Sequence, residues 1–268
     1  MNNVVVLTLI ATLGTWFVTA LGAAMVVFFR TAQNKSMNIM LGFASGVMIA
    51  ASFWSLLEPA IERAEESCPV PAYIVATSGF IAGGIFMWLC DKFINRCICN
   101  SGKYPALYGN KGLGRVIMLI LSVTLHNIPE GLAVGVAFGA LTPENFSAET
   151  LFAAISLAVG IGLQNFPEGA AVSLPLKREG FSAKASFLLG QASGMVEPLA
   201  GLAGVLLVVY VQAILPYALS FAAGTMILVS VHELIPECQQ NKDEKPYSAT
   251  MGIMAGFAFM MLLDVMLG

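Results

Sequence analysis

Eight long apolar runs constrain the fold of this chain more than any other feature. They cover residues 4–29, 38–60, 73–96, 115–141, 151–175, 183–212, 216–237 and 247–267. A helix of about 20 apolar residues crosses the hydrocarbon core of a bilayer, and each run reaches that length. Charged residues make up only 11% of the chain. The connections are short, so the sequence predicts an all-α membrane protein with eight transmembrane helices in a single domain over residues 1–268.

The lysine and arginine residues predict which way the spans run. Twelve of the 13 basic residues lie in or beside the connections that follow the first, third, fifth and seventh spans, and only Arg63 lies elsewhere. Short loops rich in Lys and Arg stay in the cytoplasm. We therefore predict a multi-pass protein of the cell (plasma) membrane with both termini outside. The net charge of −3 gives no reason to expect nucleic-acid binding.

Two pairs of spans share sequence, which indicates an internal repeat. Nine of sixteen positions agree between residues 76–91, A-T-S-G-F-I-A-G-G-I-F-M-W-L-C-D, and residues 249–264, A-T-M-G-I-M-A-G-F-A-F-M-M-L-L-D. Six of ten agree between residues 43–52, F-A-S-G-V-M-I-A-A-S, and residues 221–230, F-A-A-G-T-M-I-L-V-S. Within each pair the predicted spans run in opposite directions. Inverted repeats of this kind occur in secondary transporters, so we predict a 3+2+3 arrangement with inverted outer triplets.

Two spans carry the same polar motif near their centres. The fourth contains L-H-N-I-P-E-G at 125–131, and the fifth contains L-Q-N-F-P-E-G at 163–169. A third acid, Glu197, lies in the middle of the sixth span within S-G-M-V-E-P. A charged side chain at the bilayer centre costs about 2.5–3.5 kcal/mol on insertion scales. Three carboxylates close together would repel one another or take up protons, unless a divalent cation lies between them.

Helical spacing places the motif residues on shared faces. His126 and Glu130 are four residues apart, as are Gln164 and Glu168, so each pair points to one side of its helix. Two antiparallel helices that face each other would bring one imidazole, one amide and two carboxylates to a single point. The amides beside these faces belong to Asn127 and Asn165. Imidazole combined with carboxylate suits zinc and its neighbours in the first transition row.

These motifs resemble those of a known family. H-N-I-P-E-G, Q-N-F-P-E-G, the M-E-P of the sixth span and the H-E-L-I-P-E of the seventh are similar to motifs of the ZIP family of divalent-metal transporters, especially its GufA-like branch. The resemblance covers nearly the whole chain. It implies a 3+2+3 bundle, often a homodimer, that carries Zn²⁺ and related ions toward the cytosol as substrates. We expect no enzymatic activity and no organic cofactor, and we expect membrane lipid and metal ions as partners.

The resemblance also implies a binuclear metal site. One ion would be held by His126, Glu130, Gln164 and Glu168, with Met48 of the second span nearby. The other ion would be held by Asn127, Asn165 and Glu197 and bridged by the two motif glutamates. Some relatives carry an aspartate at the position of Asn165, and the neutral amide of this chain should weaken the second ion.

Polar residues near the span ends suggest a path for the ion. The second span runs outward, and the candidate entrance at its external end consists of Glu58, Glu62 and Ser55. The third and seventh spans run inward, and the candidate exit near their cytoplasmic ends consists of Asp91, His232 and Glu233. Such residues also occur at helix ends for topology alone. Asp264 is expected near the outer face and receives no role.

Other interpretations stay open. The prolines could be ordinary kinks, and the polar groups could form hydrogen bonds between helices. An intramembrane metalloenzyme needs a metal and a general base, but Pro236 stands where the second histidine of H-E-x-x-H would follow His232. A transporter of organic solutes would use the carboxylates to carry protons. Among metals, the residues do not rank Zn²⁺ against Fe²⁺, Mn²⁺, Cd²⁺ or Co²⁺.

Overall fold

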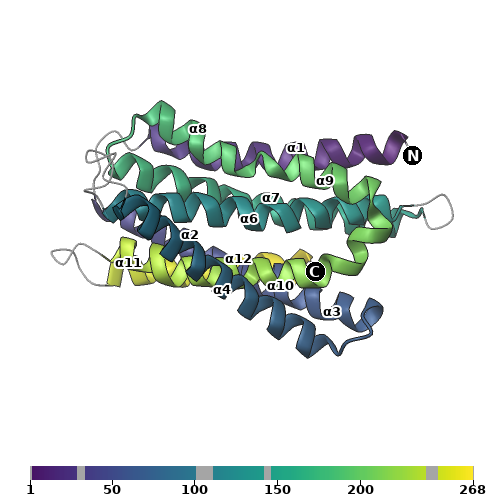
Figure 1. Cartoon of the computed structure of the whole chain (residues 1–268). Coiled ribbons are helices and arrows are strands. Elements are labelled where there is room, and N and C mark those ends of the chain that lie inside the picture. The colour runs from purple at the N-terminus through teal and green to yellow at the C-terminus, as the bar shows by residue number, and fades with distance from the viewer. Residues whose placement is uncertain (1, 29–33, 101–110, 142–145, 240–246, 268) are drawn as a thin grey trace.

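The computed structural model describes residues 2–28, 34–100, 111–141, 146–239 and 247–267 (Figure 1). These residues form helices and no β-strand, which confirms the all-α class. Six helical segments are long and apolar enough to cross a bilayer, and they match the predicted first, second, third, fifth, seventh and eighth spans. They are Val4–Val27, Asn38–Glu66, Ala72–Phe93, Ala148–Arg178, Ile214–Cys238 and Tyr247–Met266.

The helices of the N-terminal part include two irregular turns. Helix α1 covers Asn2–Ala24 and continues as a 3₁₀ turn, η1, over Met25–Val27. Helix α2 (Asn34–Ala51) leads through a π-helical turn, η2 (Ser52–Leu57), into α3 (Glu58–Ser67). Helix α4 covers Ala72–Asn100.

The remaining chain contains two long central helices and a second π-helical turn. Helices α6 and α7 cover Lys111–Gly139 and Ala148–Arg178. Helices α8, α9 and α10 follow over Ala183–Gly194, Val196–Leu206 and Val208–Val229. The turn η3 (Ser230–Leu234) then leads into α11 (Ile235–Cys238), and α12 covers Tyr247–Leu267.

The sixth predicted span is the one that differs most from the structure. The apolar run at 183–212 divides into α8, α9 and the start of α10, with interruptions at Met195 and Leu207. Pro198 has no backbone N–H, so the carbonyl four residues earlier, on Gly194, cannot form the usual helical bond, and α8 ends at that residue. The fourth run coincides with α6. Neither run is among the six spanning segments found within the described residues.

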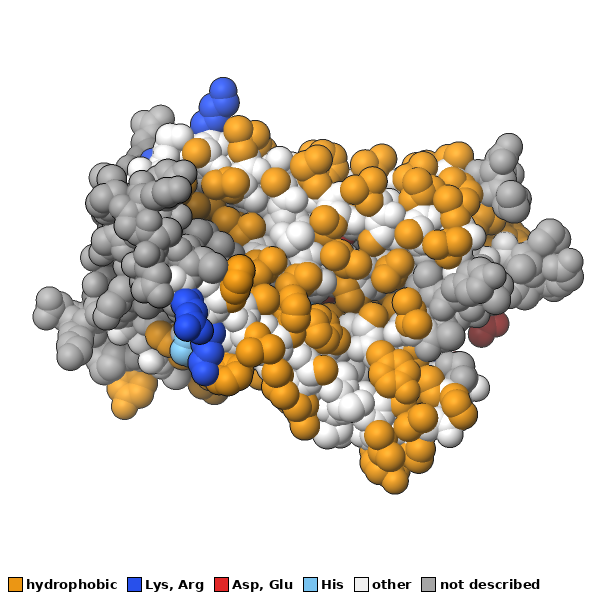
Figure 2. All heavy atoms as spheres, viewed as in Figure 1, with side chains coloured by type: hydrophobic (Ala, Val, Ile, Leu, Met, Phe, Trp, Pro, Cys, Tyr) orange, Lys and Arg blue, Asp and Glu red, His pale blue; other side chains and the backbone are white. Residues whose placement is uncertain are grey.

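The surface has the distribution expected of a protein in lipid. Figure 2 shows apolar side chains over the middle of the face in view, while the Lys and Arg side chains on this face gather at one end, near α11 and the start of α8. We call this the basic end. Four of the basic residues behind the orientation prediction lie outside the described residues: Arg30, Lys103, Lys242 and Lys245.

The helices that carry the sequence repeat make equivalent contacts. Helix α2 packs against α12, and α10 packs against α4. A Cβ on Gly46 would overlap the backbone of Ile253, and a Cβ on Gly224 would overlap the backbone of Phe80. The repeat aligns Gly46 with Gly224 and Ile253 with Phe80. The turns η2 and η3 also begin at aligned serines. The glycines thus allow both helix pairs to approach closely in the same register.

A second set of helices surrounds the motif residues. Helix α1 packs against α7, α8 and α9, while α6 packs against α9 and α7. Figure 1 shows α6 and α7 lying alongside each other through the centre of the bundle. The two polar motifs of the sequence therefore lie inside the protein, where neighbouring helices cover them.

Candidate metal centre

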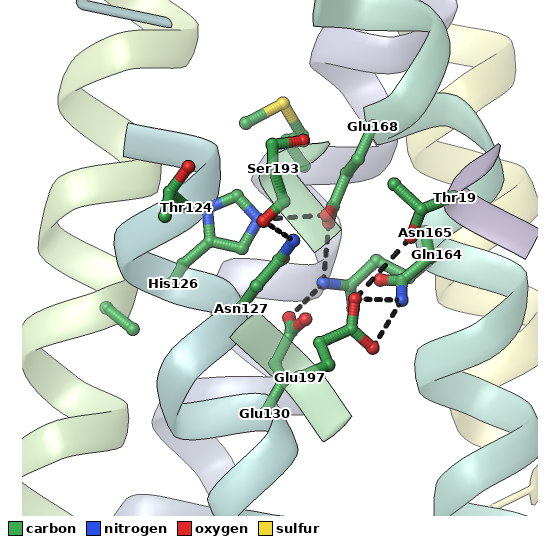
Figure 3. A network of polar contacts seen from close by, with 12 residues as sticks. Thr19, Thr124, His126, Asn127, Glu130, Gln164, Asn165, Glu168, Ser193 and Glu197 are labelled. Carbon is green, nitrogen blue, oxygen red and sulfur yellow. Dashed lines mark hydrogen bonds and ion pairs between the residues drawn. The ribbon is translucent and has the colours of Figure 1, made fainter. Parts of the chain in front are cut away.

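Four polar side chains meet between α6 and α7. His126 and Glu130 lie one turn apart on α6, and Gln164 and Glu168 lie one turn apart on α7. All four residues are at most 1% exposed. Figure 3 shows their side chains converging from the two helices. The structure therefore brings together the residues that the helical spacing predicted to share one point.

Glu168 and Gln164 connect this cluster through hydrogen bonds. A carboxylate oxygen of Glu168 lies 2.8 Å from Nε2 of His126, and the other accepts from the amide nitrogen of Gln164 at 2.8 Å. The same amide nitrogen donates to Glu130 at 2.5 Å. One ligand atom from each of His126, Glu130 and Glu168 lies within 4.8 Å of the other two. Zinc binds such atoms at about 2.0–2.2 Å, so a small contraction would bring all three onto one ion.

Several acceptor atoms in the cluster lack a hydrogen-bond partner within the part of the chain that the structure describes. They are Nδ1 of His126, Oε2 of Glu130 and Oε1 of Gln164. A buried polar group without a partner costs about 1–3 kcal/mol, and a charged one costs more. A single cation can satisfy several such atoms at once. The donor set of imidazole, carboxylate and amide oxygen fits a divalent transition metal.

Glu197 forms a second polar cluster beside the first. Nδ2 of Asn165 lies 2.9 Å from each carboxylate oxygen of Glu197. The hydroxyl of Thr15 on α1 donates to Oε2 at 2.5 Å, and that of Thr19 donates to Oε1 at 3.5 Å. The side-chain oxygens of Asn165 and Asn127 have no partner among the described residues. This cluster also offers buried acceptors to a cation.

The local backbone explains why these helices can approach so closely. The interruption at Met195 places Glu197 in the first turn of α9, where the helix dipole favours a negative charge. A Cβ on Gly131 would overlap the carbonyl oxygen of Glu197, and a Cβ on Gly169 would overlap that of Thr19. The glycine that follows each motif glutamate therefore gives α9 and α1 access to the centre.

The predicted entrance residues lie together at one end of α7. Ser55, Glu58 and Glu62 line a cavity of about 670 Å³, which we call the α7 cavity. Asp264 also lines it and accepts a hydrogen bond of 2.9 Å from Ser55. No role was predicted for Asp264 from the sequence, whereas its hydrogen bond to Ser55 joins the second and eighth spans at this cavity. Glu149 is the remaining acid in the lining.

The other predicted residues lie away from the central cluster and the α7 cavity. Met48 is fully buried in the hydrophobic core on α2. Nε2 of His232 lies 4.0 Å from the carboxylate of Glu233, and their side chains are 67% and 8% exposed. Asp91 is half-buried on α4. Their roles as metal neighbour and exit residues stay predictions.

Sequence reasoning missed the partners that α1 supplies to Glu197. Thr8, Thr12, Thr15 and Thr19 are all buried and recur every three or four residues in the first apolar run. This helical period was visible in the sequence and would have indicated a polar stripe facing the protein interior. The partner of that stripe depends on the packing of α1 against α9, which the sequence pattern does not reveal.

Comparison with known proteins agrees with these findings. The family model described as ZIP Zinc transporter matches residues 108–264. The chain is 40% identical over 331 aligned positions to "Zinc transporter ZIP11" of Xenopus tropicalis, with 97% of each protein covered. It is 39% identical to "Zinc transporter ZIP11" of Homo sapiens, again with 97% of each covered. It is 36% identical to "Zinc transporter GufA" of Myxococcus xanthus, with 97% of this chain and 98% of that protein covered.

Proposed function

The chain belongs to the ZIP family of zinc transporters, and on this premise we propose that it carries zinc across a membrane as an integral multi-pass protein. The family consists of transporters, so the chain is not an enzyme. One structural observation supports the proposal independently of the family match. It is the fully buried group of His126, Glu130 and Glu168, whose ligand atoms lie within 4.8 Å of one another.

The primary ion position lies between α6 and α7. Glu130 and Glu168 supply negative charge, His126 supplies an imidazole nitrogen, and Gln164 supplies an amide oxygen. The unpartnered acceptor atoms of three of these residues support this assignment. Met48 of α2 would lie nearby. Binding requires ionised carboxylates and a neutral imidazole, so zinc and protons compete for the same atoms.

An adjacent position lies beside Glu197. Asn127 and Asn165 would contribute amide oxygens, and the motif glutamates would bridge the two ions. The unpartnered oxygens of both asparagines support this position. The hydrogen bonds that Glu197 already accepts from Asn165 must be exchanged or shared when an ion enters. We therefore expect the second ion to bind more weakly than the first.

The ion path runs along α7. Ions enter through the α7 cavity past Glu58, Glu62 and Ser55, bind near the middle of the helix, and leave toward the cytosol past the exit residues. The cavity reaches Ile161, which lies one helical turn before Gln164, and this short distance supports access of ions to the centre from this cavity. The proposed exit residues are Asp91, His232 and Glu233.

The full architecture is a 3+2+3 bundle of eight spans with inverted outer triplets. The equivalent contacts of α2 with α12 and of α10 with α4 support the repeat. The concentration of basic residues at one end supports a cytoplasmic location for that end, with both termini outside. We further propose that the protein lies in the plasma membrane, forms homodimers, and accepts Cd²⁺, Fe²⁺, Mn²⁺ or Co²⁺ in addition to zinc.

Zinc uptake into liposomes tests the site. Glu130→Ala and Glu168→Ala should each abolish uptake while the protein still inserts and purifies normally. Glu65→Gln removes a carboxylate from the exposed face of α3 and serves as the control. Wild-type uptake by both site variants would refute the assignment. Metal content of the purified protein separates this function from proton-coupled transport of an organic solute, which requires no bound metal.

A further inference from the structure

The two halves of α7 lie in very different surroundings. Its first half, including Glu149, Ser156 and Ile161, lines the α7 cavity. The rim of this cavity carries exposed carboxylates, among them Glu58 and Glu149. The cavity therefore opens to the exterior of the bundle and leads inward to within one turn of the metal centre.

The second half of α7 is closely packed by neighbouring helices. Every residue from Gly169 to Leu176 is buried. Leu174 and Leu176 belong to the same hydrophobic cluster as Leu41 of α2 and Val229 of α10. An ion at the centre thus has an open cavity on one side and close apolar packing on the other. In this structure the metal centre is therefore accessible from the α7 cavity and closed toward the basic end.

A partly buried ion pair links α7 to its neighbours at the basic end. Arg178, the last residue of α7, donates to the carboxylate of Glu237 at 2.6 Å and to its carbonyl oxygen at 3.2 Å. The other guanidinium nitrogen donates to Oδ1 of Asn38 at 2.7 Å. The side chains of Arg178 and Glu237 are 16% and 6% exposed, and Asn38 is 3% exposed. A planar guanidinium that bonds two partners at once fixes their relative positions.

These three residues join the two sets of helices. Arg178 belongs to α7, which carries half of the metal centre and packs with α1, α6 and α8. Asn38 lies in the second turn of α2, which packs against α12, and Glu237 lies in α11, which also packs against α2. The two sets also pack directly against each other, through α2 with α7 and α10 with α6. Their separation would break both contacts of Arg178.

We propose that Arg178, Glu237 and Asn38 form a latch that holds the transporter closed at the basic end while the α7 cavity is open. The latch rests on the proposed transport function and adds a conformational role to residues outside the metal centre. It opens when α7 moves against α2 and α11, and it closes again when the cavity reopens. Breaking it shifts the population toward the state that is open at the basic end.

Thiol labelling of two positions on α7 tests the latch. Ser156→Cys reports on the cavity, and Ser173→Cys reports on the closely packed half, where the serine is fully buried. Each is introduced into a chain whose five native cysteines are replaced by alanine. A water-soluble maleimide is applied to open membrane fragments, so both faces are reached. Labelling rates then report on the exposure of each half, whatever the orientation of the protein.

Arg178→Gln should slow labelling at position 156 and speed labelling at position 173, each several-fold. Lys177→Gln removes the same charge one residue earlier and should leave both rates close to those of the parent. Glu237→Gln, a milder change, should shift both rates in the same directions as Arg178→Gln. Equal rates in Arg178→Gln and Lys177→Gln would overturn the latch. Faster labelling at both positions would also overturn it, because general loosening is not a shift between two states.

A reversible cross-link provides a second test. Arg178→Cys and Glu237→Cys, joined by a short reducible bifunctional reagent, should lose zinc uptake and recover it on reduction, with bound zinc per chain unchanged. Continued uptake by the cross-linked protein would overturn the latch. A wild-type chain that takes up no zinc would instead count against the proposed function, and the labelling rates would still decide on the latch.

Discussion

Replacing Glu130 by glutamine tests whether a cation is needed to hold the buried carboxylates together. Ligand atoms of Glu130 and Glu168 lie within 4.8 Å of each other. At an effective dielectric constant of about 20, two unit charges of like sign at that distance repel each other by about 3.5 kcal/mol. The metal-free protein can relieve part of this repulsion by binding a proton. Glu130→Gln removes the charge with little change of shape.

The variant should therefore respond in opposite ways to the absence and presence of zinc. Without metal, its free energy of unfolding should equal that of the wild type or exceed it by an amount on the order of 3 kcal/mol. With free zinc at 100 times the dissociation constant, the wild type gains about 2.7 kcal/mol by mass action. Glu130→Gln should lose that gain, because the cluster loses a charged ligand.

Thermal unfolding of the purified protein in detergent measures both effects. Each protein is unfolded in the presence of a chelator and again with excess zinc. Glu65→Gln on the exposed face of α3 is the matched control and should retain the wild-type response. The reasoning is refuted if Glu130→Gln is clearly less stable than the wild type without metal and yet gains as much stability from zinc.

Three further predictions follow from the site and its packing. Zinc uptake into liposomes should fall as the pH is lowered from about 7.5 to 5.5, because protons compete for the imidazole and carboxylates; a flat profile would contradict this. Thr15→Val should lower the free energy of unfolding by about 1.5–3 kcal/mol through loss of the bond to Glu197, and Thr8→Val, which breaks a bond within α1, should cost less. Gly131→Ala should cost about 1–3 kcal/mol because its Cβ would overlap α9, while Gly14→Ala, with open space around it, should be tolerated. Chemical unfolding measures both comparisons, and equal costs within either pair would argue against the packing described.

The sequence predicted the helical class and most span positions because lipid imposes one simple requirement. A spanning helix needs a long apolar run, and the six segments that meet this requirement coincide with predicted spans. Helix ends were less accurate. The second span was expected to end at residue 60, but α3 extends it to Ser67. The sequence of α3, E-P-A-I-E-R-A-E-E-S, is polar, so apolarity alone could not detect its helical continuation.

The central cluster was predictable because its residues repeat at a fixed spacing. The four-residue interval places His126 with Glu130 and Gln164 with Glu168, and the duplication indicates that the two helices share a site. The contacts of Arg178 were not predictable in this way. Its partners lie 59 and 140 residues away along the chain. They come together through packing between helices that have no common sequence period.

Anomalous diffraction from crystals of the zinc-loaded wild-type chain tests the central claim most directly. A peak at the zinc absorption edge should lie between α6 and α7, about 2.0–2.2 Å from oxygen atoms of Glu130 and Glu168 and a ring nitrogen of His126. A map in which zinc binds only elsewhere, while these three side chains keep their hydrogen bonds to one another, would contradict the account.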